Sequence, residues 1–141
     1  MTAGVAEGGN GGPDVPLRPV SGAAVWTAAE LRERGEWLHV LRPDEIAELS
    51  AAADAVAVAG VDLRALDPDR FELPRFGSVL ARLRKRIIDG IGFVQLRGLP
   101  VARFGRRKAA TIFWGIARHL GDEVVSQNGR GNLLDLSLIH I

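Results

Sequence analysis

The sequence predicts an α+β fold, in which amphipathic helices precede and follow a few short strands. Apolar residues recur at helical spacing in three segments, residues 43–60, 76–89 and 105–120. Between the last two lies the run 92–100 (GFVQLRGLP), whose apolar residues favour a strand and whose glycines and proline delimit it. We expect this strand to be buried between its two flanking helices and to organise the rest of the chain.

The composition is typical of a globular protein with no strong overall charge. The 141 residues include 18 basic and 17 acidic ones, a balance that gives no global field to attract nucleic acid or anionic membranes. The absence of cysteine excludes disulfides, thiolate metal sites and cysteine nucleophiles. Neither a signal peptide nor an apolar run of about 18 residues is present. We therefore expect a cytoplasmic protein with no membrane partner.

Residues 1–22, rich in glycine, alanine and proline, are expected to form a disordered leader. The glycine run within them lacks the Gly-Lys-Ser/Thr ending of a phosphate-binding loop. Order should begin at Trp26, because Thr27 and Glu30 have the spacing of a capping box. Trp26 and Leu31 occupy the positions of a hydrophobic staple, and Gly35 should end this short helix.

The next elements are a brief strand and a longer helix. Residues 37–41 (WLHVL) alternate in character, so we expect a strand with Trp37, His39 and Leu41 on one face. Pro43 suits the first position of the following helix, and Gly60 suits its C-cap. The apolar face of that helix should consist of Ile46, Leu49, Ala53 and Val56.

Two further amphipathic helices flank the central strand. The first, residues 76–89, has an apolar stripe of Val79, Leu80, Leu83 and Ile87. The second, residues 105–120, has a stripe of Ala109, Ile112, Phe113, Ile116 and Leu120. A strand over residues 123–126 and a glycine-rich turn over residues 127–132 should follow.

The three histidines, His39, His119 and His140, do not form a local metal motif. None has a carboxylate two residues on, and no two are three or four residues apart. A facial triad of two histidines and one carboxylate therefore cannot be assembled from any local motif. We expect His39 to be an ordinary strand histidine, and His119 to interact with the free carbonyls at the end of its own helix.

Two other features could serve binding. Basic residues cluster between positions 82 and 108, as on a nucleic-acid surface, although most of them fall on the polar faces of two predicted amphipathic helices, where solvated charge is the rule. The members of this basic cluster are Arg82, Arg84, Lys85, Arg86, Arg97, Arg103, Arg106, Arg107 and Lys108. The loop 126–131 (SQNGRG) offers amide side chains after a predicted strand, and could equally be a glycine-assisted turn.

With these residues laid out, the chain resembles the N-terminal portion of a TauD/TfdA-type dioxygenase over residues 23–135. The resemblance rests on an ordered series of blocks, none of them diagnostic alone. The blocks are 24–27 (AVWT), 37–39 (WLH), 41–46 (LRPDEI), 90–101 (GIGFVQLRGLPV), 113–117 (FWGIA), 119–121 (HLG), 126–128 (SQN) and 131–134 (GNLL).

The resemblance implies the first strands of an incomplete double-stranded β-helix, or jelly roll, in a protein that binds Fe(II) and 2-oxoglutarate. It implies oxidation, usually hydroxylation, of a small organic substrate with release of succinate and carbon dioxide. The family's His-x-Asp/Glu motif, distant histidine and arginine lie beyond the matched part, so no metal or catalytic residue is assigned here. Gln127 and Asn128 are the candidate substrate-binding residues, because their segment leads toward the missing motif.

The last six residues, 136–141 (LSLIHI), depart from the family pattern. One reading frame of the transposase mosaic-end adapter used in sequencing libraries encodes these six residues. We therefore interpret them as adapter read-through, with a native apolar strand as the alternative. A jelly roll needs about eight strands, and this chain offers fewer. We therefore expect an inactive fragment that binds neither iron nor 2-oxoglutarate. The alternative function is a non-catalytic interaction or nucleic-acid module that uses the basic helices.

Overall fold

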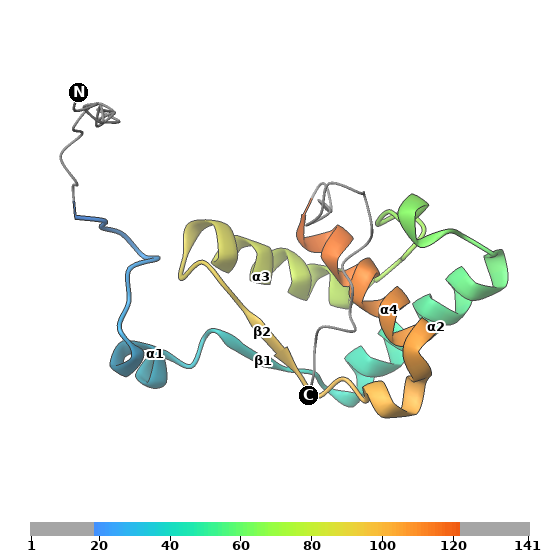
Figure 1. Cartoon of the computed structure of the whole chain (residues 1–141), viewed down its shortest axis with the longest axis horizontal. Coiled ribbons are helices and arrows are strands. Elements are labelled where there is room, and N and C mark those ends of the chain that lie inside the picture. The colour runs from blue at the N-terminus through green and yellow to red at the C-terminus, as the bar shows by residue number, and fades with distance from the viewer. Residues whose placement is uncertain (1–18, 122–141) are drawn as a thin grey trace, which may run out of the picture.

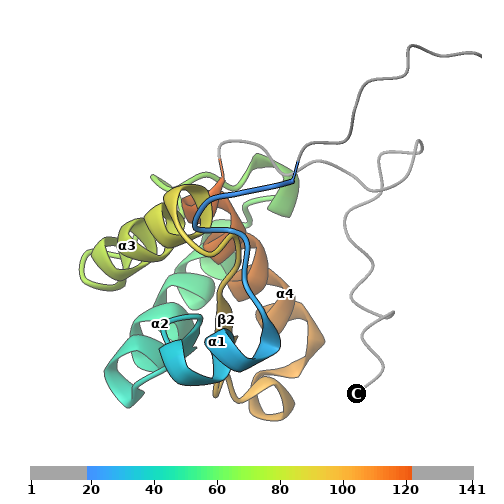
Figure 2. The ribbon, with the colours of Figure 1, turned by 90° about the vertical axis from the view of Figure 1, so that its left-hand side faces the viewer.

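The computed structural model of the chain describes residues 19–121. Their elements in chain order are α1 (Ala28–Arg34), β1 (Leu38–Val40), α2 (Pro43–Ala59), the 3-10 helix η1 (Leu63–Ala65), α3 (Phe76–Asp89), β2 (Gln95–Arg97) and α4 (Val101–Leu120). In Figure 1, α1 lies at one end of the two strands, and α2 and α4 lie toward the other. Figure 2, viewed from the α1 side, draws α2 and α3 to one side of β2 and α4 to the other, and behind the strands α4 packs directly on α2 and α3.

The described strands form one two-stranded parallel sheet. Leu38, His39 and Val40 of β1 are in register with Gln95, Leu96 and Arg97 of β2. A parallel pair needs a long crossover, and here α2, η1 and α3 supply it. Residues 19–121 are therefore a mixed helix-and-strand structure, as predicted. The double-stranded β-helix, which is built from antiparallel strands, remains a prediction.

Local sequence signals position the first two helices as predicted. The Thr27 hydroxyl accepts from the Glu30 amide, and the Glu30 carboxylate accepts from the Thr27 amide at 2.6 Å, which confirms the capping box. Gly35 ends α1 and Gly60 ends α2 in the left-handed conformation, with φ of 58° and 64°. Pro43 occupies the start of α2, where its missing amide hydrogen costs nothing.

The core forms where α4 packs against α2 and α3. Its fully buried large side chains come from α2, the 61–75 loop, α3 and α4; they are Leu49, Leu66, Phe71, Phe76, Leu80 and Ile112. The predicted faces of α2 and α3 supply Leu49, Ala53, Val56, Leu80 and Leu83 to this core. The helical periodicity of these two segments therefore identified their buried sides.

The start of α4 differs from the prediction. The helix was expected from Gly105, but helical residues begin at Val101, and Gly105 interrupts them with φ 73° and ψ 163°. That conformation is open to glycine and strained for any residue with a Cβ. Gly105 thus makes a kink between the first helical turn, which begins at Val101, and the main part of α4.

Two predicted burials are wrong. Phe113 is 40% exposed, whereas its neighbour Trp114 is 7% exposed and belongs to the core. The central strand is also less buried than expected, since it is three residues long and Gln95 and Arg97 are exposed. The reason is that side chains alternate along the strand, so Leu96 packs against the core while Gln95 and Arg97 point to the opposite, exposed face.

Aromatic contacts attach α1 to the segment leading into β2. Trp26 Nε1 donates to the Ile91 carbonyl at 3.0 Å, and Trp37 Nε1 donates to the Leu31 carbonyl at 2.8 Å. Both indole rings pack on Phe93, with ring centroids 5.3 Å and 6.2 Å apart. These contacts hold α1 in place although the helix itself buries no residue.

The expected boundaries at residues 22 and 135 are not tested by the structure, and the predicted strand 123–126, turn 127–132 and terminal segment 136–141 lie outside the described residues. Within residues 19–121, the structure contains no helix that is both long and apolar enough to cross a membrane.

Candidate functional site

The candidate substrate-binding residues Gln127 and Asn128 lie outside the described part of the chain, as does His140. The site can therefore be built only from what residues 19–121 bring together. Four features carry chemistry there: two histidines with their partners, an apolar groove beside β2, a charged cavity beside α2, and the basic cluster.

His39 lies in β1, as predicted, and bonds to a buried carboxylate, a contact that the sequence did not point to. Its Nε2 lies 3.0 Å from Oε2 of Glu45, whose side chain is 3% exposed. The same Oε2 accepts from the Arg42 amide at 2.9 Å, and Oε1 lies 3.3 Å from the Arg42 guanidinium. Glu45 therefore caps the start of α2 and joins it to β1, which is a structural role. The sequence signal for this cap is a glutamate, Glu45, at the third position of a helix that begins at Pro43.

His119 interacts with a different partner from the one predicted. Its Nε2 lies 2.8 Å from the Phe71 carbonyl, and the two rings meet edge-on with centroids 6.5 Å apart. The expectation of a bond to its own helix end is therefore wrong. The carbonyl comes from the loop before α3, a partner 48 residues away that helical periodicity cannot reveal.

The described residues do not fit an iron centre. Within positions 19–121, no three histidine, aspartate or glutamate side chains gather as metal ligands would. A facial triad needs two histidines and one carboxylate around open positions, but His39 and His119 are each bound to a different structural partner. No ligand in this part of the chain is assigned to iron.

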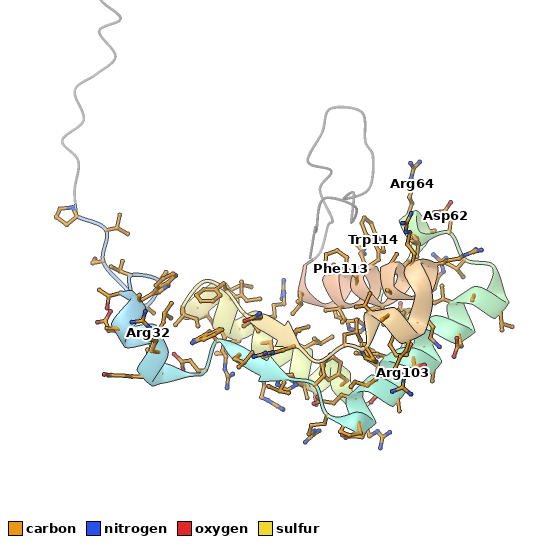
Figure 3. All side chains as sticks on the ribbon, turned by 60° about the horizontal axis from the view of Figure 1, so that its bottom comes forward. Arg32, Asp62, Arg64, Arg103, Phe113 and Trp114 are labelled. Atoms are coloured by element: carbon orange, nitrogen blue, oxygen red, sulfur yellow. The ribbon has the colours of Figure 1, made fainter. Side chains whose placement is uncertain are left out.

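An apolar hollow of 840 Å³, which we call the β2 groove, lies between β2, α3 and α4. Its apolar lining comes from Leu83 and Ile87 of α3, Val94, Leu96 and Leu99 around β2, and Phe113, Ile116 and Leu120 of α4. Exposed Phe113 is part of this lining. Figure 3 shows Phe113 and Trp114 projecting from α4, with Arg103 at its opposite end. The groove offers apolar surface but few groups able to perform acid–base chemistry.

A smaller cavity of 490 Å³ between α2, η1 and α4 carries charged residues. Lys108 Nζ lies 2.7 Å from both carboxylate oxygens of Asp54 and 5.2 Å from the centre of the Phe104 ring. Asp62 accepts from the Arg64 amide and so caps η1. Each of these charged side chains is thus already paired, Lys108 with Asp54 and Asp62 with a backbone amide.

Several members of the basic cluster have partners within the fold. Lys85 pairs with Asp89, and Lys108 pairs with Asp54. Arg86 donates to the Glu36 carbonyl at 3.0 Å, and Arg84 donates to the Leu120 carbonyl at 3.1 Å. Lys108 thus joins α4 to α2, and Arg84 joins α3 to the end of α4. Arg86 ties α3 to the segment before β1, whereas the Lys85 pair lies within α3.

Comparison with known proteins gives two relatives. FR-33289 synthase from Streptomyces rubellomurinus is 30% identical over 119 residues, which are 84% of this chain and 35% of the relative. A taurine hydroxylase-like protein from Stachybotrys chartarum is 32% identical over 97 residues, 69% of this chain and 25% of the relative. No family model matches the chain. The chain thus spans between a quarter and about a third of the curated relatives it matches.

Proposed function

Since this chain belongs to the TauD/TfdA-type family, we propose that it is the N-terminal part of a longer oxygenase that depends on Fe(II) and 2-oxoglutarate. The observation that carries the proposal is the similarity to two curated relatives over most of the chain, one of them named for taurine hydroxylation. The whole protein would oxidise a small organic substrate. One oxygen atom of O₂ would enter that substrate, and the other would enter succinate as carbon dioxide leaves 2-oxoglutarate.

In this proposal the described residues build a scaffold and hold no iron. The three larger helices and the 61–75 loop form a packed core, against which Leu96 of β2 packs. The β2 groove beside this core offers an apolar surface to further polypeptide. The iron, when bound in the whole protein, supplies the oxidising chemistry. Its ligands would lie beyond residue 135.

The 141-residue chain alone tests the scaffold role. Anaerobic calorimetric titration with Fe(II) and 2-oxoglutarate should show no one-to-one binding at micromolar affinity, because residues 19–121 gather no ligand set. Saturable one-to-one binding at that affinity would contradict the proposal.

The longer protein tests the reaction. Genomic sequence read past codon 135 should continue into a His-x-Asp/Glu motif, and the encoded protein should release succinate only with Fe(II) present. The same protein loaded with Zn(II) is the matched control, because zinc has no redox chemistry. A natural stop codon directly after Ile141, or succinate release equal with zinc, would refute the proposal.

Gln127 and Asn128 are proposed to contact the substrate in that longer protein. Asn128→Ala should raise KM for the substrate, because a buried hydrogen bond to an amide would be lost. Unchanged kinetics would remove Asn128 from the site.

A further inference from the structure

The outer edge of β2 has unpaired backbone groups within the described residues. The Gln95 amide donates to the Trp37 carbonyl at 2.7 Å, and the Leu41 amide donates to the Arg97 carbonyl at 2.8 Å. Backbone groups of alternate residues in a parallel strand point to opposite neighbours. The amide and carbonyl of Leu96 therefore point away from β1, and Leu96 itself lines the β2 groove. An open strand edge beside an apolar surface is a template for another strand.

The end of α4 delivers the chain to this edge. Leu120 and Gly121 line the same groove as Val94 and Leu96. The Leu120 carbonyl accepts from Arg84 Nε at 3.1 Å, which ties the end of α4 to α3. Gly121 is extended, with φ −141° and ψ 152°, so the chain leaves the helix in a strand-like conformation.

We propose that residues 123–126 (EVVS) form a third strand, which pairs in parallel with the free edge of β2 and covers the β2 groove. This segment starts two positions after Gly121. Val124 and Val125 are β-branched and favour a strand, and successive side chains alternate, so one of them faces the groove. The 20 residues of α4 exceed the dozen or so that a parallel crossover requires.

The occupant is the chain's own segment, because its tether keeps it beside the groove at high effective concentration. A second copy of the chain would have to bind without that advantage. The proposal does not depend on the oxygenase function, since neither iron nor substrate enters it.

Amide hydrogen exchange of the full 141-residue chain tests the pairing. The Leu96 amide should be protected, and the double substitution Val124→Asp with Val125→Asp should lower its protection by at least about tenfold. The matched control is Val20→Asp with Val58→Asp, because these valines are 80% and 90% exposed. The control should keep the Leu96 protection, and the Leu80 amide in α3 reports whether the core stays folded.

Cross-linking gives a second measurement that needs no destabilising charge. The chain has no cysteine, so Phe113→Cys can be combined with Val124→Cys or Val125→Cys and treated with a short bis-maleimide. One pair should cross-link within the monomer at least about tenfold faster than Val58→Cys with Val125→Cys, given its proximity.

Three results would overturn the proposal. The first is a Leu96 amide that exchanges at the unprotected rate in the unmodified chain. The second is a cross-linking rate no higher than that of the Val58 control. The third is protection that appears only as protein concentration and dimer fraction rise together, which would assign the groove to a second copy.

Discussion

Replacing Gly115 by alanine tests the closest packing in the core. Gly115 is buried in the middle of α4, opposite Phe71, which has no exposed surface. A Cβ added there would lie 2.5 Å from Cγ and Cε1 of the Phe71 ring, a separation that real Cβ atoms do not show. The ring cannot swing into solvent, and its own backbone carbonyl is bound to His119.

Two effects of opposite sign decide the result. In an ordinary helix, exchanging glycine for alanine stabilises by about 1 kcal/mol. Forcing an extra methyl group into a packed core costs about 1–3 kcal/mol, and the short distance to a fully buried ring favours the upper part of that range. We expect Gly115→Ala to lower the free energy of unfolding by about 1–2 kcal/mol in total, the difference between the two.

Urea denaturation followed by far-UV circular dichroism measures this change. Gly77→Ala in α3 is the matched control, because its Cβ would meet only the Leu73 side chain at 3.7 Å, an ordinary contact. The control should be neutral or more stable than the unmodified chain. Phe71→Leu should partly relieve Gly115→Ala in a double-mutant cycle. A Gly115→Ala protein as stable as the control would refute this packing.

Three further predictions concern the caps and the kink. Glu45→Gln should lower the free energy of unfolding, measured by urea denaturation, by about 1–3 kcal/mol, because a buried acceptor of two hydrogen bonds loses its charge. The control Asp44→Asn, at an exposed neighbour, should change that free energy by less than about 0.5 kcal/mol. Equal losses in the two variants would contradict the cap. Gly105→Ala should lower the free energy of unfolding by about 1–3 kcal/mol through backbone strain. Gly60→Ala should lower it by only about 1 kcal/mol, although a Cβ would meet no neighbouring atom at either site. Urea denaturation measures both changes, and equal losses would contradict the kink. The backbone hydrogen bond from Thr27 lowers the pKa of Glu30 below its usual 4.5. The stabilisation of α1 by the ionised Glu30 cap is therefore complete above pH 4.5 and is lost as the pH falls through the lowered pKa. The amide chemical shift of Thr27, followed by NMR, should titrate below pH 4.5 and should not change with pH in Glu30→Gln.

The two walls of the β2 groove show how the family resemblance and the structure complement each other. The blocks that carry the resemblance include the run 90–101 and the segment 113–121, and both contribute to the groove. The sequence alone placed these blocks in order along the chain. Only the folded chain shows that they face one another across an apolar surface.

Helix ends were predictable because their causes are local. The Thr27–Glu30 capping box and the left-handed glycines Gly35 and Gly60 act within a few residues of themselves. The same holds for Pro43 at the start of α2 and for the apolar faces of α2 and α3. Such features depend on backbone geometry and helical period, both of which can be read from neighbouring residues.

The tertiary structure decided what distant segments contact. Helical spacing placed Phe113 in the core, but the packing of α2 and α3 on α4 buries Trp114 instead. Likewise, His119 bonds to the loop carbonyl of Phe71, and Arg84 bonds to the end of α4. Sequence period determines a helix face only to within about one position, whereas burial depends on which neighbours arrive at that face. That choice belongs to the whole folded chain.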